Sequence, residues 1–249
     1  MINYLINDKI ALIKLNRPEK HNALHPELVK EFKEKLKLAA EDKNIRIIII
    51  TGEGKSFCAG ADLEYLNNLT SYSSIENEED SKSLADLFLQ IYNFPKPTIA
   101  AVNGAAIAGG CGLASVCDIV IADKQHAKFG YTEVKIGFIP AIVSIFLIRK
   151  IGEGRARQLL LTGELINAET AFQYGLVNYL TGNAGIYAVE LANELLKNSD
   201  YSMQFTKKIV NDISRMPVEK AVEYCSELNV ISRTSEDFIK GLSLFLNKK

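Results

Sequence analysis

The sequence predicts an α/β protein with a helical C-terminal region. Over roughly the first two thirds of its 249 residues, β-branched and other apolar runs alternate with amphipathic stretches. From Ile186 onward, apolar residues recur almost only at helical spacing. We therefore expect a core at residues 1–185 and a helical region, suited to self-association, at residues 186–249.

The composition limits the class of protein. Hydrophobic residues make up 47% of the chain and charged residues 24%, which is typical of a globular protein with a buried core. The net charge of −1 gives no electrostatic reason to expect nucleic acid or an anionic membrane as a partner. No basic segment followed by an apolar one marks a secretory signal, so we expect a cytoplasmic protein. Four cysteines without a C-x-x-C pair, and three histidines, predict buried reduced thiols and no metal site.

The first elements follow from local signals. Tyr4–Ile6 and Ile10–Leu15 are predicted to form a hairpin, because Asn7-Asp8 between them is a turn signal. Pro26 opens a predicted helix to about Glu41. Ile45–Thr51 is almost continuously β-branched, which favours a strand covered on both faces.

The middle of the chain mixes polar and apolar signals. Ser71–Asp80 is acidic and lacks an apolar period, so it is predicted to be a mobile surface loop. Ser81–Asn93 is a predicted helix that stops before Pro95. Thr98–Val102 and Ile119–Ala122 are predicted strands, and three short helices, each followed by a glycine cap, are predicted at 143–151, 154–161 and 168–174. Thr98–Cys117 is uncharged and nearly long enough for a membrane span, but Asn103 and several glycines interrupt it.

Two segments are suited to carbonyl chemistry. Gly109-Gly110-Cys111-Gly112 follows the 98–102 strand through a turn at 103–108 and enters a helical stretch. Glycines at a helix start leave backbone N–H groups bare at the positive end of the helix dipole, where they can stabilise an oxyanion. A second donor is predicted at Ala61, at the start of a helix that runs to about Leu69.

These segments resemble the crotonase family, also called the enoyl-CoA hydratase/isomerase superfamily. The resembling motifs run in order along nearly the whole chain, at residues 15–24, 57–62, 101–104, 117–119, 129–134 and 162–166. The resemblance implies a crotonase-like spiral of β-β-α turns with C-terminal helices that pack against neighbouring subunits. It also implies a trimer or a dimer of trimers and an acyl-CoA thioester substrate, with no cofactor apart from the coenzyme A of the substrate.

Glu133 is the predicted acid–base residue. Its neighbours are largely apolar or aromatic, and desolvation raises a carboxyl pKa toward the range that is useful near neutral pH. In many crotonases the matching glutamate moves a proton next to the thioester carbonyl. The resemblance thus implies that Ala61 and Gly109 donate to the thioester oxygen of an enolate while Glu133 transfers the proton.

A second acid of many hydratases is absent, because its place is taken by Gly112. Single-base chemistry, as in a double-bond isomerase, needs only one carboxylate. However, the residues from Thr132 to Ser144 resemble a branch described as hydratases, including those for short branched substrates. We therefore expect an enoyl-CoA hydratase, with an isomerase as the alternative. The candidates for the second role in a hydratase are Glu64, His25, Tyr65 and Tyr131.

Further contacts to the acyl-CoA are expected from residues of the same motifs. The resemblance implies contributions from the loop at 17–24, including Lys20 and Arg17 toward phosphate, and from Ala59, Asp62, Leu63, Glu64, Gly110 and Gly112. Asp62 is also suited to cap the helix that follows it. A dinucleotide site is excluded because the glycines do not directly follow a strand. A non-catalytic or RNA-binding member of the fold is a further alternative, disfavoured by the near-neutral charge.

Overall fold

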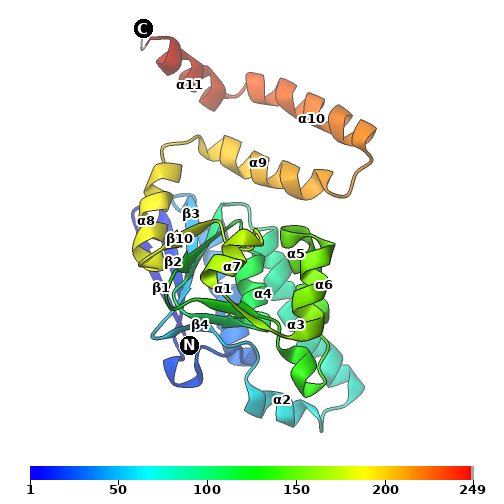
Figure 1. The fold of residues 1–249 in the computed structure, drawn as a ribbon. Coiled ribbons are helices and arrows are strands. Elements are labelled where there is room, and N and C mark those ends of the chain that lie inside the picture. The colour runs from blue at the N-terminus through cyan, green and yellow to red at the C-terminus, as the bar shows by residue number, and fades with distance from the viewer. Residues whose placement is uncertain (248–249) are drawn as a thin grey trace.

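The computed structural model describes residues 1–247 and contains two β-sheets surrounded by helices (Figure 1). The larger sheet has the strand order β1-β2-β3-β5-β7-β10. Its strands are β1 (Ile2–Asn7), β2 (Ile10–Leu15), β3 (Ile47–Gly52), β5 (Thr98–Val102), β7 (Ile119–Asp123) and β10 (Tyr179–Thr181). The smaller sheet has the order β4-β6-β8-β9 and consists of β4 (Ser56–Cys58), β6 (Ala105–Ile107), β8 (Lys128–Gly130) and β9 (Leu165–Asn167).

Helices alternate with these strands and then form the C-terminal part alone. The helices are α1 (Pro26–Glu41), α2 (Leu63–Leu69), α3 (Ser74–Tyr92), α4 (Gly109–Ser115), α5 (Ala141–Ile151), α6 (Glu153–Thr162), α7 (Ala168–Gln173), α8 (Ala184–Leu195), α9 (Asp200–Ile213), α10 (Val218–Arg233) and α11 (Glu236–Leu246). Short 3₁₀ helices occur at Pro18–Lys20 and Glu133–Ile136. The α/β class with a helical C-terminal part is confirmed.

Strand β3 shows why the chain forms a layered core. Ile48 and Ile50 face the larger apolar cluster, which includes Phe32 and Leu36 of α1. Ile47 and Ile49 face a second cluster, closed by alanines of α8. Every residue of β3 is buried, so the prediction of a strand covered on both faces is confirmed. Parallel pairing with β2 and β5 satisfies its backbone groups.

Several local predictions are also confirmed. The β1–β2 hairpin is antiparallel and turns at Asp8, which has a φ of +51°. Helix α1 has the predicted limits, and the Nδ1 atom of His25 accepts a hydrogen bond from the backbone of Glu27 as its N-cap. Helices α5, α6 and α7 each end before a glycine with positive φ, at positions 152, 163 and 175.

The prediction for Ser71–Asp80 was wrong in part, because helix α3 already begins at Ser74. Ser73 and Glu76 form a capping box, in which the Ser73 hydroxyl accepts from the Glu76 N–H and the Glu76 carboxylate accepts from the Ser73 N–H. This arrangement satisfies backbone donors at the helix start. An exposed, acidic first half of a helix needs no apolar face, which is why composition alone misassigned it.

The turn predicted at 103–108 contains strand β6, and the four strands of the smaller sheet were not predicted. Each is only three residues long. Strands of that length are stabilised by their neighbours in the sheet rather than by their own sequence. The smaller sheet matters most for the site described below.

The C-terminal helices differ in how they contact the rest of the chain. Helix α8 packs on the larger sheet, with Leu191, Leu195 and Leu196 against the second cluster. These three leucines of the 186–249 region are therefore partly covered within the chain and do not add to an apolar surface for self-association. Helices α9, α10 and α11 contain no buried residue and lie beyond the end of the sheets (Figure 1). None of the helices within residues 1–247 combines the length and apolarity needed to cross a bilayer.

Candidate active site

The candidate site lies where three neighbouring parallel strands end. Strand β6 pairs in parallel with β4 on one side and with β8 on the other. The chain leaves β4 toward Ala61, leaves β6 toward Gly109, and leaves β8 toward Glu133. Carboxyl ends of adjacent parallel strands meet at one edge of a sheet, the usual place for a ligand in α/β proteins. Residues separated by up to 72 positions in sequence are thereby gathered at one edge.

Two glycines allow the ends of β4 and β6 to approach closely. Gly60 has a φ of +87°, and a Cβ atom there would lie 2.9 Å from Cβ of Ala108 and 3.4 Å from the backbone nitrogen of Gly109. A Cβ atom on Gly110 would overlap the carbonyl group of Cys58. Side chains at either position would therefore separate the two segments, so glycine is required for the site to form.

The N–H groups of Ala61 and Gly109 donate no hydrogen bond within residues 1–247. Gly109 is the first residue of α4, where a helix has no internal acceptor for its N–H. Ala61 lies just before Asp62, the N-cap of α2, so the helix begins two residues later than Ala61. Both N–H groups are thus available to a carbonyl oxygen.

Glu133 combines burial with an unpartnered carboxylate oxygen. It begins the 3₁₀ helix at 133–136, and only 8% of its surface is exposed. Within residues 1–247, its Oε2 atom has no hydrogen-bond partner. Burial raises the pKa of this carboxyl, and a hydrogen bond from its own backbone only partly opposes that. No nearby cation among residues 1–247 contributes to lowering this pKa.

The space beside Gly112 is filled by apolar side chains. A Cβ atom on Gly112 would overlap Cγ1 of Val143, and it would lie 3.5 Å from Cζ of Phe88. Val143 belongs to α5 and Phe88 to α3, and both are buried. The sequence indicated the missing acid at Gly112 but gave no signal for its occupants, which come from two distant helices.

The four candidates for a second catalytic group all have partners. Glu64 accepts from Lys20 at 2.7 Å, the Tyr65 hydroxyl donates to Asp80 at 2.7 Å, His25 caps α1, and the buried Tyr131 hydroxyl bonds to Ser115 at 2.9 Å. Nothing in the sequence indicated that Asp80 would bind Tyr65, because Asp80 lies inside helix α3 and not in the loop predicted there. Glu133 therefore differs from these four groups in keeping a buried carboxylate oxygen without a partner.

The two basic residues of the 17–24 loop are engaged with carboxylates. Arg17 pairs with Asp62 at 3.0 Å, and both side chains are nearly buried. It is therefore not free to bind phosphate as expected. Lys20 pairs with Glu64 on the surface and can exchange this partner for a ligand. Asp62 caps α2 as predicted, accepting from the N–H groups of Glu64 and Tyr65.

The thiols near the site are inert. Cys58 and Cys111 are fully buried, as predicted, and burial raises the pKa of each to about 12. A thiol with such a pKa is protonated at neutral pH and is a poor nucleophile. Within residues 1–247, no group of three or more His, Cys, Asp or Glu side chains is placed to hold a metal ion.

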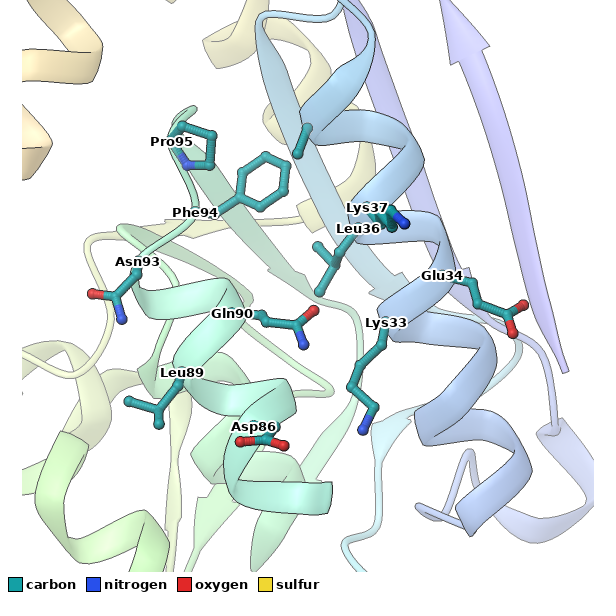
Figure 2. A pocket seen from close by; sticks show the side chains of 11 residues that line it. Lys33, Glu34, Leu36, Lys37, Asp86, Leu89, Gln90, Asn93, Phe94 and Pro95 are labelled. Carbon is teal, nitrogen blue, oxygen red and sulfur yellow. The ribbon is translucent and has the colours of Figure 1, made fainter. Parts of the chain in front are cut away.

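A separate groove of about 800 Å³ lies between α1 and α3 (Figure 2). Charged side chains from both helices line it, including Lys33, Lys37 and Asp86, and Phe94 and Pro95 close one end. None of the residues proposed for chemistry lines this groove. Its Lys33 ammonium is already bonded to Ser83 at 2.9 Å.

Comparisons with known proteins agree with this geometry. The family description "Enoyl-CoA hydratase/isomerase" matches residues 5–249. A Thermus thermophilus protein provisionally named as an enoyl-CoA hydratase is 42% identical, over 96% of this chain and 95% of its own length. The crotonyl-CoA hydratase of Syntrophomonas wolfei is 34% identical, over 97% and 93%.

Solved structures extend the comparison to the fold. An enoyl-CoA hydratase from Shewanella pealeana superposes with a TM-score of 0.94 at 30% identity, covering 100% of this chain and 94% of that one. The predicted spiral fold is thereby confirmed. With matching family motifs, relatives and architecture along its whole length, the chain belongs to the enoyl-CoA hydratase/isomerase, or crotonase, family of enzymes.

Proposed function

We propose that this enzyme adds water across the double bond of a 2-enoyl-CoA thioester to give a 3-hydroxyacyl-CoA. The observation that carries the proposal is the buried Glu133 carboxylate with an unpartnered oxygen, at the same sheet edge as two free backbone N–H groups. Relatives named as hydratases support water addition.

In the proposed reaction, the N–H groups of Ala61 and Gly109 bind the thioester oxygen. Ionised Glu133 takes a proton from water as the water oxygen bonds to C3, and the π electrons move onto the thioester oxygen to form an enolate. The two N–H groups stabilise this negative charge, which is usually a large part of the catalysis of such reactions. Protonated Glu133 then delivers its proton to C2, so that one carboxylate completes the addition and returns to its starting state.

The coenzyme A part of the substrate is proposed to lie along the 17–24 loop and the start of α2. Lys20 is the proposed phosphate contact, because its ammonium is on the surface and can leave Glu64. The Ala59 N–H already donates to the His21 carbonyl. The backbone group of Ala59 proposed to contact the ligand is therefore the Ala59 carbonyl. Leu63, Glu64 and Gly110 complete the proposed substrate contacts, whereas the Asp62 carboxylate is occupied by Arg17 and the start of α2, and Val143 fills the space beside Gly112.

A double-bond isomerase is the second candidate. The observation that favours it is the apolar filling beside Gly112, since Val143 and Phe88 offer nothing that could hold a second catalytic group. An isomerase would use the same oxyanion site, and Glu133 would move a proton between two carbons of the acyl chain. Only the source of the proton and the role of water differ between the two reactions.

Incubation with a 2-enoyl-CoA and with a 3-enoyl-CoA in ¹⁸O-labelled water separates these reactions. We expect label in a 3-hydroxyacyl product from the 2-enoyl-CoA. A shifted double bond without label would indicate the isomerase instead. Glu133→Gln should retain binding of the thioester and lose most turnover, by about 10²- to 10⁴-fold. Normal turnover in this variant would disprove the proposed role of Glu133.

We further propose that the chain self-associates as a trimer or a dimer of trimers. Helices α9, α10 and α11 have no buried residue and expose large apolar side chains. On α11, Ile239, Leu242 and Leu246 recur at helical spacing, and all are at least 44% exposed. Contiguous apolar surface of this kind is typical of a subunit interface.

A further inference from the structure

The Ala61 N–H is aimed by a small parallel ladder between two loops. The Leu24 N–H donates to the Gly60 carbonyl at 2.7 Å, and the Asp62 N–H donates to the Leu24 carbonyl at 3.0 Å. The two hydrogen-bond partners of Leu24, Gly60 and Asp62, thus flank Ala61, and Leu24 and Ala61 form an isolated parallel bridge. In a paired strand the backbone groups of successive residues point to opposite sides, so the Ala61 N–H points away from the 21–24 loop.

Arg17 bonds to both sides of this ladder. One terminal nitrogen of its guanidinium donates to the Ala23 carbonyl at 3.0 Å, and the other donates to the Asp62 carboxylate at 3.0 Å. Ala23 precedes Leu24 and Asp62 follows Ala61, so a single planar group spans the residues next to the bridge. The guanidinium is rigid and bidentate, which suits it to fix two partners at once.

The Asp62 carboxylate connects this clamp to helix α2. Its Oδ2 atom accepts from Arg17, and its Oδ1 atom accepts from the N–H groups of Glu64 and Tyr65. Burial acts to raise the pKa of the Asp62 carboxyl, but these donors outweigh burial and hold the pKa below its usual value. The carboxylate therefore stays ionised at neutral pH and bound on both sides.

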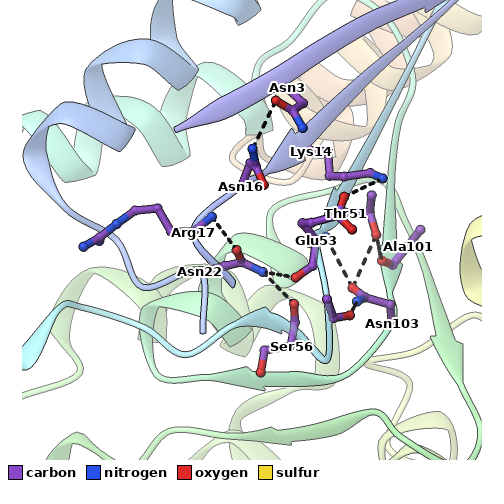
Figure 3. Close-up of polar contacts among 12 residues, drawn as sticks. Asn3, Lys14, Asn16, Arg17, Asn22, Thr51, Glu53, Ser56, Ala101 and Asn103 are labelled. Atoms are coloured by element: carbon purple, nitrogen blue, oxygen red, sulfur yellow. Dashed lines mark hydrogen bonds and ion pairs between the residues drawn. The ribbon is translucent and has the colours of Figure 1, made fainter. Parts of the chain in front are cut away.

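The backbone of Arg17 is itself anchored to the body of the protein. Its N–H donates to the Asn22 side chain at 2.9 Å, and Asn22 donates in turn to the carbonyls of Glu53 and Ser56 (Figure 3). Asn22 is fully buried. The ladder is thus held from one end by a fixed loop and across its width by the Arg17 side chain.

We propose that Arg17 is a positioning residue for the oxyanion site, holding the Ala61 N–H in the direction that the thioester oxygen requires. The inference rests on the proposed function, because the Ala61 donor is part of it. A donor contributes only when it is aimed at the developing charge, and an error of about 1 Å can cost about 10²-fold in rate. Arg17 would then act on the reaction without touching the substrate.

Replacement of Arg17 by Gln tests this role. We expect kcat on a 2-enoyl-CoA to fall by about 10- to 100-fold, with KM changed by less than about threefold, because the lost interaction matters mainly in the transition state. Arg17→Lys should recover only part of kcat, since an ammonium lacks the planar fork that reaches both partners.

An infrared readout separates positioning from a general loss of folding. Butyryl-CoA with a ¹³C-labelled thioester carbonyl binds without being hydrated, and hydrogen bonds lower the carbonyl stretching frequency. We expect the bound carbonyl to be shifted down in the wild-type enzyme and less shifted in Arg17→Gln. Asp62→Asn should reproduce this loss while still capping α2, because asparagine is a good N-cap. The double variant Arg17→Gln/Asp62→Asn should cost little more than either alone, since the two act as one unit.

Arg46→Gln is the matched control. Arg46 also bonds to two carbonyls, of Leu196 and Asn198, and lies 3.3 Å from the Asp200 carboxylate, but it joins the body to α9. This variant should lower the melting temperature and leave kcat and the carbonyl frequency unchanged.

Two outcomes would overturn the inference, and they differ. If the wild-type enzyme shifts the carbonyl and Arg17→Gln matches it in frequency and kcat, the role of Arg17 is wrong while the oxyanion site stands. If the wild-type enzyme itself leaves the carbonyl of butyryl-CoA unshifted, the proposed function fails and the positioning role falls with it.

Discussion

Gly112 and Val143 are in contact, and a Cβ atom on Gly112 would overlap Cγ1 of Val143. The absence of a side chain in α4 therefore allows α5 to approach it closely. An acidic residue at position 112 would have to displace Val143 before it could reach the substrate. The proposed water activation therefore depends on the single carboxylate of Glu133.

Gly112→Ala is expected to lower the free energy of unfolding by about 1–3 kcal/mol, because the added methyl group is forced against Val143. Combining it with Val143→Ala should cost less than the sum of the two single changes, since the cavity accepts the new methyl group. Urea denaturation measures both effects. Gly154→Ala is the control: a Cβ atom there meets no atom within 4 Å, so stability should be unchanged or higher. Equal stability of Gly112→Ala and wild type would contradict the packing argument. Val143→Ala alone is the background in which Gly112→Glu can test a second acid, because it removes the methyl group that a side chain at position 112 would overlap.

The pH dependence of kcat/KM should report Glu133. As a general base it must be ionised, so the rate falls as pH falls through its pKa. Burial raises that pKa above the usual glutamate value of about 4.3, and the acid limb should be displaced upward accordingly. Steady-state rates between pH 4 and 9 measure the limb. An acid limb at or below the usual glutamate value would show that another group carries the proton.

Stability should also depend on Glu133, with a definite sign. Folding raises the pKa of Glu133, so the folded state favours the protonated carboxyl. This contribution to the free energy of unfolding is fully present below the pKa that Glu133 has in the unfolded chain. It is lost as pH rises through the higher pKa that Glu133 has in the folded protein. At pH 8 wild type carries a desolvated carboxylate that Glu133→Gln lacks. The variant should therefore melt at a higher temperature than wild type at pH 8, and the difference should shrink toward pH 4. Glu190→Gln, at an exposed position of α8, is the matched surface control for the loss of one carboxylate. A gap that stayed constant with pH would argue against a buried ionised Glu133.

Light scattering should give a mass that is a multiple of three times the 27.6 kDa of one chain. Leu242→Asp on the apolar side of α11 should shift the protein to smaller species, because a charge there would be buried without a partner. Lys240→Gln on the same helix, with a side chain that is 73% exposed, should leave the mass unchanged. A monomer at micromolar concentration in the wild type would contradict the proposed assembly.

The sequence by itself determined the elements whose signals are local. The largely β-branched run of β3, the proline start of α1, and the glycine ends of α5, α6 and α7 depend on residues within a few positions of one another. It also indicated Glu133, Ala61 and Gly109, because an apolar setting for a carboxylate and the bare N–H groups near helix starts can be recognised from neighbouring residues. The capping box of Ser73 and Glu76 is also a local signal, but the acidic residues around it lack the apolar period by which a helix is recognised.

Only the tertiary structure decided which of these separate segments pair and which of their side chains come into contact. The three-residue strands β4, β6 and β8 exist because they pair with one another, and their pairing brings Ala61, Gly109 and Glu133 to one edge. The filling of the Gly112 position by Val143, and the pairing of Arg17 with Asp62 across 45 positions, depend on how separate segments meet. Such contacts form only once the chain has closed the long loops between the partners, so no pattern within one segment encodes them.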